Sequence, residues 1–152
     1  MGITIERITQ ENLSDFLDMV EFRLKGLWPE QPTPASENAL WALSQPNFWM
    51  YGARLDGERM QGWIAMAFAP KVGKFKRGHV YINELWVSPA HRRHGIAKEL
   101  MARADEIAEE LKADGLRLYV DGDNTGARRL YQQCGFTMDG PADYMQKICI
   151  DV

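Results

Sequence analysis

The fold is decided by a stretch of sixteen residues, Asn83-Glu84-Leu85-Trp86-Val87-Ser88-Pro89-Ala90-His91-Arg92-Arg93-His94-Gly95-Ile96-Ala97-Lys98. A β-type apolar run over residues 79–87 stops at Ser88-Pro89, a short basic turn follows, and an amphipathic helix then begins. The first N–H groups of a helix have no partner inside it, and the helix dipole places partial positive charge there. This order of strand, tight loop and helix predicts a binding site for an anion such as a pyrophosphate.

The residues of the turn sharpen this prediction. Gly95 has no Cβ and lets a ligand approach the backbone, while Arg92, Arg93 and Lys98 bring positive charge to the same place. Two common phosphate loops are excluded, because neither G-x-x-x-x-G-K-[ST] nor G-x-G-x-x-G occurs in the chain. What the turn contains is Arg92-x-x-Gly95-x-Ala97.

This pattern resembles the R/Q-x-x-G-x-G/A signature of the GCN5-related N-acetyltransferases (GNAT), which binds the pyrophosphate of acetyl-coenzyme A. A second segment, Asn124–Phe136, resembles the family's N-x-x-A-x-x-L-Y-x-x-x-G-F motif. Both motifs stand in the family's order, and the resemblance is specific from Val80 to Phe136. Over residues 1–75 it rests on the order of the expected elements alone.

The length of 152 residues predicts one domain, residues 1–152. Hydrophobic periodicity predicts eleven elements: strands over 3–8, 48–55, 60–68, 79–87, 116–120, 136–138 and 144–150, and helices over 12–28, 36–43, 95–112 and 125–134. The resemblance implies an α/β fold in which helices flank a mixed, mostly antiparallel sheet. It also implies that the fourth and fifth strands splay apart and admit the acyl-pantetheine arm.

Composition and charge set limits on function. No run approaches 18 apolar residues, no signal pattern opens the chain, and Cys134 and Cys149 lack metal-ligand spacing. A cytoplasmic protein without a metal site or a membrane contact is therefore expected. A net charge of −3 argues against general nucleic-acid binding. The charge is uneven, since residues 1–50 hold seven acids and three bases; this acidic half either suits an amine substrate or consists of solvated helix faces.

The resemblance assigns the cofactor-binding residues. Arg92 opens the phosphate motif, and the main-chain N–H groups of Arg93, His94, Gly95, Ile96, Ala97 and Lys98 would meet the pyrophosphate oxygens. Leu85 and Val87 would offer main-chain groups to the pantetheine amides, and Asn124 would hold the pantetheine or thioester region. The expected cofactor is acetyl-CoA.

Acetyl transfer to an amine requires a base to take the amine's proton and an acid for the departing thiolate. Tyr131 matches the family position whose hydroxyl lies near the thioester sulfur; its alternative is a core tyrosine packed on the sheet. Glu84 interrupts an apolar strand and is the candidate base, the alternative being a glutamate satisfied by an arginine or by backbone N–H groups. The family often has a bulge here, so the face of Glu84 cannot be read from the sequence. Many relatives draw on water chains instead of one base.

The expected function is acetyl-CoA-dependent N-acetylation of a primary amine by direct attack in a ternary complex. Trp28 and Trp41 flank the connection that borders the acceptor site in this family, and with Glu84 they are the candidate acceptor-binding residues; on base rates both tryptophans are core. A small cationic amine, such as a polyamine or an aminoglycoside, is the expected acceptor. A protein or peptide acceptor and a non-catalytic acyl-CoA sensor are the alternatives, and a homodimer through residues 144–150 remains open.

Overall fold

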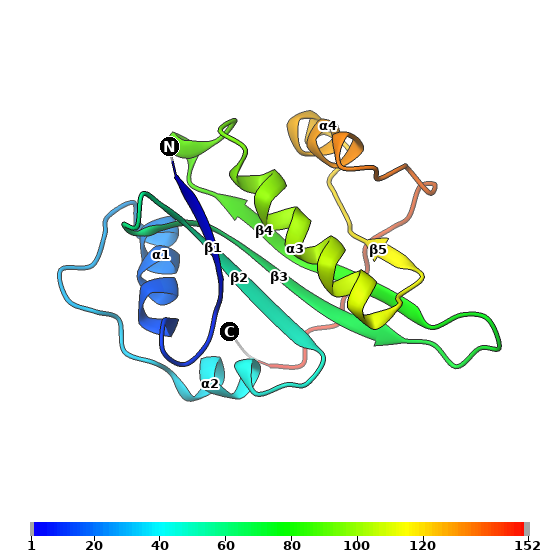
Figure 1. The fold of residues 1–152 in the computed structure, drawn as a ribbon, viewed down its shortest axis with the longest axis horizontal. Helices are drawn as coiled ribbons and strands as arrows, with labels where there is room; N and C mark the ends of the chain where they lie inside the picture. Colours follow the sequence, from blue (N-terminus) through cyan, green and yellow to red (C-terminus); the bar gives the residue numbers. More distant parts are fainter. Residues whose placement is uncertain (1, 151–152) are drawn as a thin grey trace. The chain divides into compact units, whose positions relative to one another are not determined.

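The computed structural model describes residues 2–150, which divide into two compact units, Met1–Tyr119 and Val120–Val152. The first unit holds one sheet and three α-helices, and the second holds one helix (Figure 1). Their bounds are β1 Ile3–Arg7, α1 Leu13–Lys25, α2 Glu37–Leu43, β2 Phe48–Leu55, β3 Met60–Pro70, β4 Gly78–Val87, α3 Ile96–Leu111, β5 Gly115–Arg117 and α4 Thr125–Gln133. A short 3₁₀ turn, Pro89–His91, follows β4.

The five strands form a sheet in chain order, β1-β2-β3-β4-β5. The pairs from β1 to β4 are antiparallel, and β5 runs parallel to β4. The predicted fold class, a mixed and mostly antiparallel sheet flanked by helices, is therefore confirmed. The parallel pairing covers only His79 to Tyr81, so the remainder of β4 has no strand on that side among residues 2–150.

Local chemistry explains where most elements begin and end. The turn after β2 has positive φ at both Asp56 and Gly57, with the Glu58 N–H bonded to the Leu55 carbonyl at 2.9 Å, which is the geometry of a type I′ turn. Ser36 caps α2 by accepting the Ala39 N–H at 3.1 Å. The first helix was predicted to run to Trp28-Pro29, but it ends at Lys25 because Gly26 adopts a left-handed conformation first.

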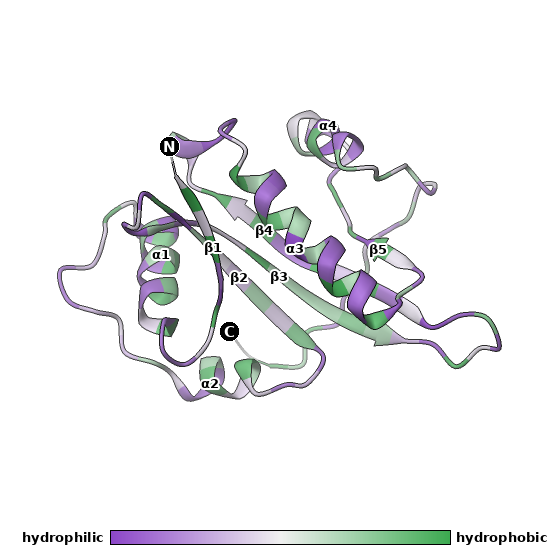
Figure 2. Ribbon diagram, in the orientation of Figure 1, coloured by the Kyte–Doolittle hydropathy of each residue, from purple (hydrophilic) through white to green (hydrophobic). Residues whose placement is uncertain are grey.

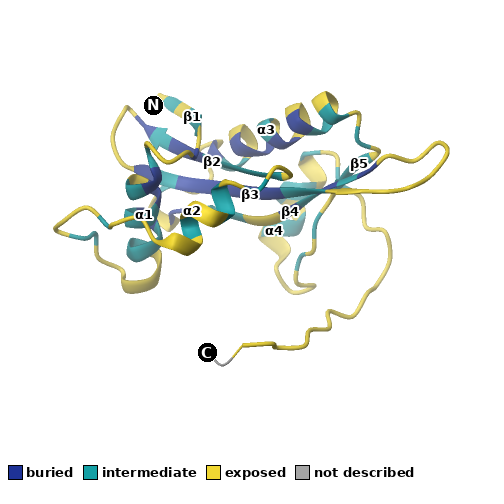
Figure 3. Cartoon of the chain, turned by 90° about the horizontal axis from the view of Figure 1, so that it is seen from below, coloured by how far each residue is buried: buried dark blue, intermediate teal, exposed yellow. Residues whose placement is uncertain are grey.

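Helices cover both faces of the sheet (Figure 3). One face carries α1 and α2, where a cluster of buried side chains joins the helices to β3: Ile8, Leu13, Phe16, Met19, Met60 and Trp63. The other face carries α3, whose apolar stripe is visible in Figure 2. That stripe buries Ile96, Leu100, Met101, Ala104 and Ile107. Each large side chain buried in this way contributes roughly 1.5–3 kcal/mol, so the stripe is sufficient to hold α3 on the sheet.

A β-bulge in β4 assigns its side chains to the two faces. Ala65 of β3 pairs with Glu84 and Met66 pairs with Ile82, so Asn83 is an extra residue without a partner in the ladder. Residues opposite each other in a ladder share a face, which places Glu84 with Trp63 on the α1 face and Ile82 on the α3 face. Strict alternation would have put Glu84 and Ile82 together, and the bulge separates them.

Two strand predictions at the C-terminal end were wrong, and the strand before them has other bounds than predicted. The fifth strand spans Gly115–Arg117 rather than 116–120, and neither 136–138 nor 144–150 forms a strand in the described structure. The alternation of apolar residues over 144–150 is real, but a strand also needs a neighbouring strand to satisfy its backbone groups. No such neighbour pairs with this segment within residues 2–150, and Tyr144, Met145, Ile148 and Ile150 remain exposed.

In the second unit, α4 begins after Asn124 and stops at Gln133, with Gly135 just beyond at φ 95°. The predicted end at Cys134 differs by one residue, because Cys134 is the C-cap. The Phe136 N–H bonds back to the Tyr131 carbonyl at 3.0 Å, which satisfies one of the last carbonyls of the helix.

Candidate active site

The loop between β4 and α3 leaves its main-chain nitrogens available. The first intrahelical bond of α3 joins the Glu99 N–H to the Gly95 carbonyl at 3.0 Å, so the N–H groups of Ile96, Ala97 and Lys98 have no carbonyl partner in the helix. Gly95 is the N-cap and has no side chain to cap them. A Cβ built on Gly95 would meet nothing within 4 Å, so the space beside the N-cap itself is open.

The backbone of this loop holds two residues with positive φ, Arg93 at 64° and Gly95 at 88°. For arginine this conformation is uncommon, and strained backbone tends to be kept where it serves binding. Arg92 donates from Nε to the Val87 carbonyl at 3.0 Å, which fixes its side chain against the end of β4. Arg92, Arg93 and Lys98 are exposed, and within residues 2–150 none of them has an ion-pair partner. The loop is thus a cationic surface with open N–H donors, which fits a diphosphate.

Beside the loop, the second half of β4 presents main-chain groups on its unpaired side. The Ser88 N–H donates to the Gln61 carbonyl at 2.8 Å, so Ser88 faces β3. Backbone groups alternate along an antiparallel strand, and Val87 and Leu85 therefore direct theirs away from β3. On that side the ladder to β5 has ended at Tyr81. A ligand with amide groups can continue the strand pattern along Leu85 and Val87.

Glu84 lies on the sheet face that α1 covers, and its partner is a tryptophan. The Nε1–H of Trp63 donates to Oε2 of Glu84 at 3.0 Å. Neither an arginine nor a backbone N–H holds this carboxylate in residues 2–150, in contrast to the alternative considered from the sequence. Trp63 is 2% exposed whereas Glu84 is exposed. The carboxylate is thus anchored on one oxygen and open on the other, as a general base requires.

Two tryptophans and an arginine surround Glu84. Trp63 and Trp86 are cross-strand partners with ring centroids 5.1 Å apart. The guanidinium carbon of Arg23, from α1, lies 5.2 Å from the Trp63 centroid and 5.5 Å from that of Trp86. These distances are within the range of cation–π attraction. No sequence motif singles out Trp63 or Arg23, because only the register of β3 on β4 and the packing of α1 bring them to Glu84.

The two tryptophans proposed for the acceptor differ in their surroundings. Trp28 stacks on Phe22 with centroids 4.4 Å apart, and the Arg59 guanidinium carbon lies 4.6 Å from its centroid. Trp41 is 67% exposed on α2. The cation over the Trp28 ring is therefore Arg59, a side chain of the protein itself.

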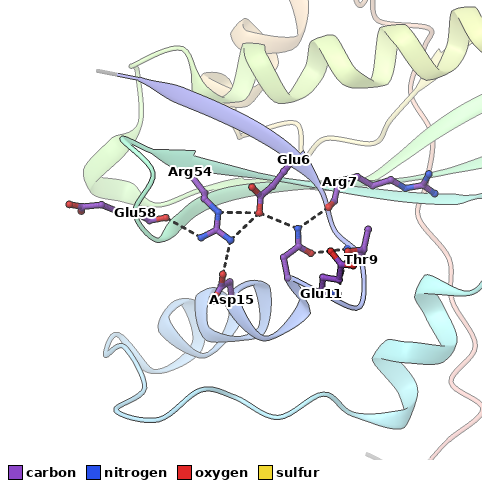
Figure 4. Close-up of polar contacts among 8 residues, drawn as sticks. Glu6, Arg7, Thr9, Glu11, Asp15, Arg54 and Glu58 are labelled. Atoms are coloured by element: carbon purple, nitrogen blue, oxygen red, sulfur yellow. Dashed lines mark hydrogen bonds and ion pairs between the residues drawn. The ribbon is translucent and has the colours of Figure 1, made fainter.

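Internal contacts hold several of the acids in residues 1–50. Arg54 pairs with Glu6 at 2.9 Å and with Asp15 at 2.6 Å (Figure 4). Asp18 accepts from both the main-chain N–H and the hydroxyl of Thr33, and Glu21 pairs with Lys25. Four of the seven acids thus serve the fold, which supports the interpretation of this half as structural.

The second unit contains Asn124 and Tyr131. The Asn124 side-chain oxygen accepts the Ala127 N–H at 3.1 Å and so caps α4. Tyr131 is half-buried, and its ring meets Phe136 edge-on with centroids 6.0 Å apart. Burial raises the pKa of the Tyr131 phenol above its ordinary value, with a smaller contribution from the charge of Cys134. The hydroxyl therefore keeps its proton at neutral pH, as an acid must.

Other chemistries have less support. Among residues 2–150, no three His, Cys, Asp or Glu side chains are placed to hold a metal ion. In the same range, no helix combines the length and apolar character needed to cross a bilayer. In the turn after β4, Nδ1 of His91 is buried and lacks a hydrogen-bond partner in the described structure.

Comparison with known proteins identifies the family independently of the site geometry. The model of the Acetyltransferase (GNAT) family matches residues 6–136. The chain is 30% identical to YdgE, an uncharacterised N-acetyltransferase of Bacillus subtilis, over 91% of this chain and 94% of that protein. An acetyltransferase of Agrobacterium fabrum is 41% identical over 45% of this chain, which spans only about half, 49%, of that relative.

Among solved structures, the aminoglycoside N-acetyltransferase AAC(6')-Iy in complex with the bisubstrate analogue CoA-S-monomethyl-acetylneamine has the same fold. The TM-score is 0.74 at 20% identity, with 98% of this chain and all of that chain covered. The fold and the loop define an acetyltransferase, and the chain belongs to the GNAT family.

Proposed function

We propose that this protein is an acetyl-CoA-dependent N-acetyltransferase in which a primary amine attacks the thioester directly in a ternary complex. The observation that carries the proposal is the set of unpartnered N–H groups at the start of α3, flanked by three exposed cations. These groups suit the pyrophosphate of coenzyme A. The edge of β4 at Leu85 and Val87 has no neighbouring strand and suits its pantetheine amides, with the Val87 carbonyl also accepting from Arg92 Nε. The bound cofactor supplies an activated acyl group.

The chain's own groups match the two proton transfers. An alkylammonium with a pKa near 10.4 must lose its proton, a cost of about 4.6 kcal/mol at pH 7. The free oxygen of Glu84 is the proposed acceptor of this proton, directly or through water. Tyr131 is the proposed acid for the thiolate, supported by its family motif and its raised pKa. Asn124 is proposed to bind the pantetheine or thioester region through the amide hydrogens that the cap leaves free.

The acceptor proposed from the sequence is a small cationic amine such as a polyamine or aminoglycoside, as for the structural neighbour above. A protein or peptide acceptor is the runner-up. A homodimer also remains a proposal, supported by the exposed apolar side chains of residues 144–150.

Release of free coenzyme A tests the function. Purified protein is incubated with acetyl-CoA and a panel of polyamines, aminoglycosides, amino acids and short peptides, and the new thiol is titrated against an amine-free blank. Amine-dependent release supports the transferase. Tight acetyl-CoA binding without release by any amine would indicate the acyl-CoA sensor instead.

A further inference from the structure

Arg23 lies on the tryptophan that holds Glu84, the proposed base. It belongs to α1, it is exposed, and its guanidinium lies against the rings of Trp63 and Trp86. A guanidinium over an aromatic face keeps its N–H donors in its own plane, where they can still bind a ligand. The two tryptophans thus orient Arg23 without using its hydrogen bonds.

The charge of Arg23 is not compensated within the protein. In residues 2–150, no carboxylate lies within ion-pair distance of it, and no hydrogen bond joins it to another residue. Arg54 is the contrast, because its side chain is only 18% exposed and contacts Glu6, Asp15 and the Glu58 carbonyl (Figure 4). Lys25, two residues along α1, pairs with Glu21 at 2.7 Å. A fixed and unpaired arginine is equipped to receive a carboxylate from a ligand.

Arg23 and Glu84 are opposite charges that share one tryptophan. Trp63 presents its face to Arg23 and its Nε1–H to Glu84. The two groups do not form an ion pair with each other. A ligand with an ammonium and a carboxylate can therefore place its ammonium at Glu84 and its carboxylate at Arg23.

The face of the sheet that carries Glu84 and Arg23 is poorly suited to a ligand with a second ammonium group. The aromatic faces that would attract one already carry the guanidinium groups of Arg23 and Arg59. Four of the seven acids in residues 1–50, Glu6, Asp15, Asp18 and Glu21, already hold contacts within the fold. Like charges in proximity oppose binding, so a polycation is disfavoured relative to a zwitterion.

We propose that Arg23 is a specificity-determining residue and that the acceptor is a small primary amine carrying a carboxylate. This inference rests on the proposed acetyltransferase function and favours an amino-acid-like acceptor over the polyamine or aminoglycoside expected from the sequence.

Three amines with one five-carbon chain and different ends test the proposal: 5-aminopentanoate, pentylamine and 1,5-diaminopentane. The reacting amine is the same in all three, and only the distal charge changes. We expect kcat/KM for the carboxylate to exceed that for the diamine at least tenfold. A shorter series, 3-aminopropanoate with propylamine and 1,3-diaminopropane, covers a different spacing. A wild-type preference for the diamine in both series would overturn the proposal.

Arg23→Gln should lower the ratio of kcat/KM for the carboxylate to kcat/KM for the diamine by about tenfold, which corresponds to 1.4 kcal/mol. The change should come mainly from a higher KM for the carboxylate. Arg23→Lys retains the charge without the planar fork and should lose only part of the preference for the carboxylate. Lys25→Gln removes the same charge from a side chain paired to Glu21 and should leave the ratio unchanged. An unaltered ratio in Arg23→Gln, or an equal change in Lys25→Gln, contradicts the role of Arg23.

A binding experiment separates this inference from the proposed function. The unreactive compounds 5-acetamidopentanoate and N-pentylacetamide are titrated by calorimetry into protein saturated with coenzyme A. Arg23-dependent preference for the carboxylate supports the inference even if no amine is acetylated, in which case the catalytic proposal alone fails. Equal binding of the two compounds, or no binding of either, overturns it.

Discussion

The indole Nε1–H of Trp63 donates to the Glu84 carboxylate at 3.0 Å, across two neighbouring strands. The bond exists because Asn83 is an extra residue in β4, which turns Glu84 toward the face that Trp63 occupies. One oxygen of Glu84 is held by a buried donor, and the other has no hydrogen-bond partner within residues 2–150. The bulge thus aims a carboxylate that an unbroken strand would have aligned with Ile82.

Glu84→Gln tests the base. The carboxamide oxygen still accepts the Trp63 N–H, so the fold should be preserved while proton acceptance is lost. We expect kcat to fall by about 10²–10⁴ with the acetyl-CoA Kd unchanged. Steady-state kinetics and calorimetry measure the two quantities. Glu109→Gln, on the exposed face of α3, is the matched control; an unchanged kcat in Glu84→Gln would favour a water chain as the base.

Trp63→Phe tests the anchor. It removes the donor to Glu84 and opens space beside Phe16, whose ring contacts Trp63 edge-on at 5.3 Å. We expect a loss of roughly 1–3 kcal/mol in the free energy of unfolding, measured by urea denaturation. In a double-mutant cycle with Glu84→Ala the two effects should not add, because both remove one bond. Full additivity would show that the hydrogen bond contributes little.

Gly95→Trp tests the diphosphate loop. Gly95 has φ 88° and open space in front of it, so an indole there both strains the loop and fills the space before the α3 N–H groups. We expect calorimetric binding of acetyl-CoA to disappear. Gly57→Trp places the same side chain at another positive-φ glycine with open space, in the β2–β3 turn, and should retain binding. Wild-type affinity in Gly95→Trp would refute the site.

Tyr131→Phe tests the acid. We expect kcat to decrease about 10²-fold or more, with little change in acetyl-CoA affinity. Because burial raises the pKa of Tyr131, wild-type kcat should show no fall from its deprotonation below about pH 10. The exposed Tyr119, replaced by Phe, is the control. A wild-type decline near pH 8–9 that vanishes in Tyr131→Phe would contradict the raised pKa, and an undiminished kcat would remove Tyr131 from the mechanism.

Asp114 tests a pH-dependent contribution to stability. Hydrogen bonds from the Gly78 and Arg77 N–H groups lower the pKa of this carboxyl below its ordinary value. A carboxyl with a lowered pKa in the folded state stabilises the protein above its unfolded pKa, near 3.9, and loses this effect as pH falls through the folded value. Asp114→Asn should therefore lower the melting temperature at pH 7 and progressively less below pH 4. A difference that is constant from pH 7 to pH 3 would contradict this assignment.

Much of the fold could be predicted because local chemistry sets it. The strand Phe48–Leu55 has the predicted bounds, and α3 differs by one residue at each end from the prediction. Gly26, Asp56-Gly57 and Ser36 act through backbone conformations and capping bonds that involve residues a few positions away. Patterns of this kind are complete within a short segment.

The failures share one cause. The strands predicted over 136–138 and 144–150 have apolar alternation, but a strand is completed by a partner that its own residues do not specify. The face of Glu84 depended in the same way on how β4 aligns with β3. Arg23 could not be connected with Glu84, because α1 and β4 are about sixty residues apart in the chain and meet only through the packing of Trp63.

The sequence by itself determined the loop that is proposed to bind a diphosphate, since a helix start, a glycine and three cations are local and need no distant partner. It also carried both family motifs, and the match to the GNAT family model confirms the family that they implied. Only the tertiary structure decided which groups surround the candidate base: the register of β3 on β4 gave Glu84 a tryptophan, and the packing of α1 added an unpaired arginine. Hydrogen bonds and charges across strands depend on distances in space, which chain order does not contain.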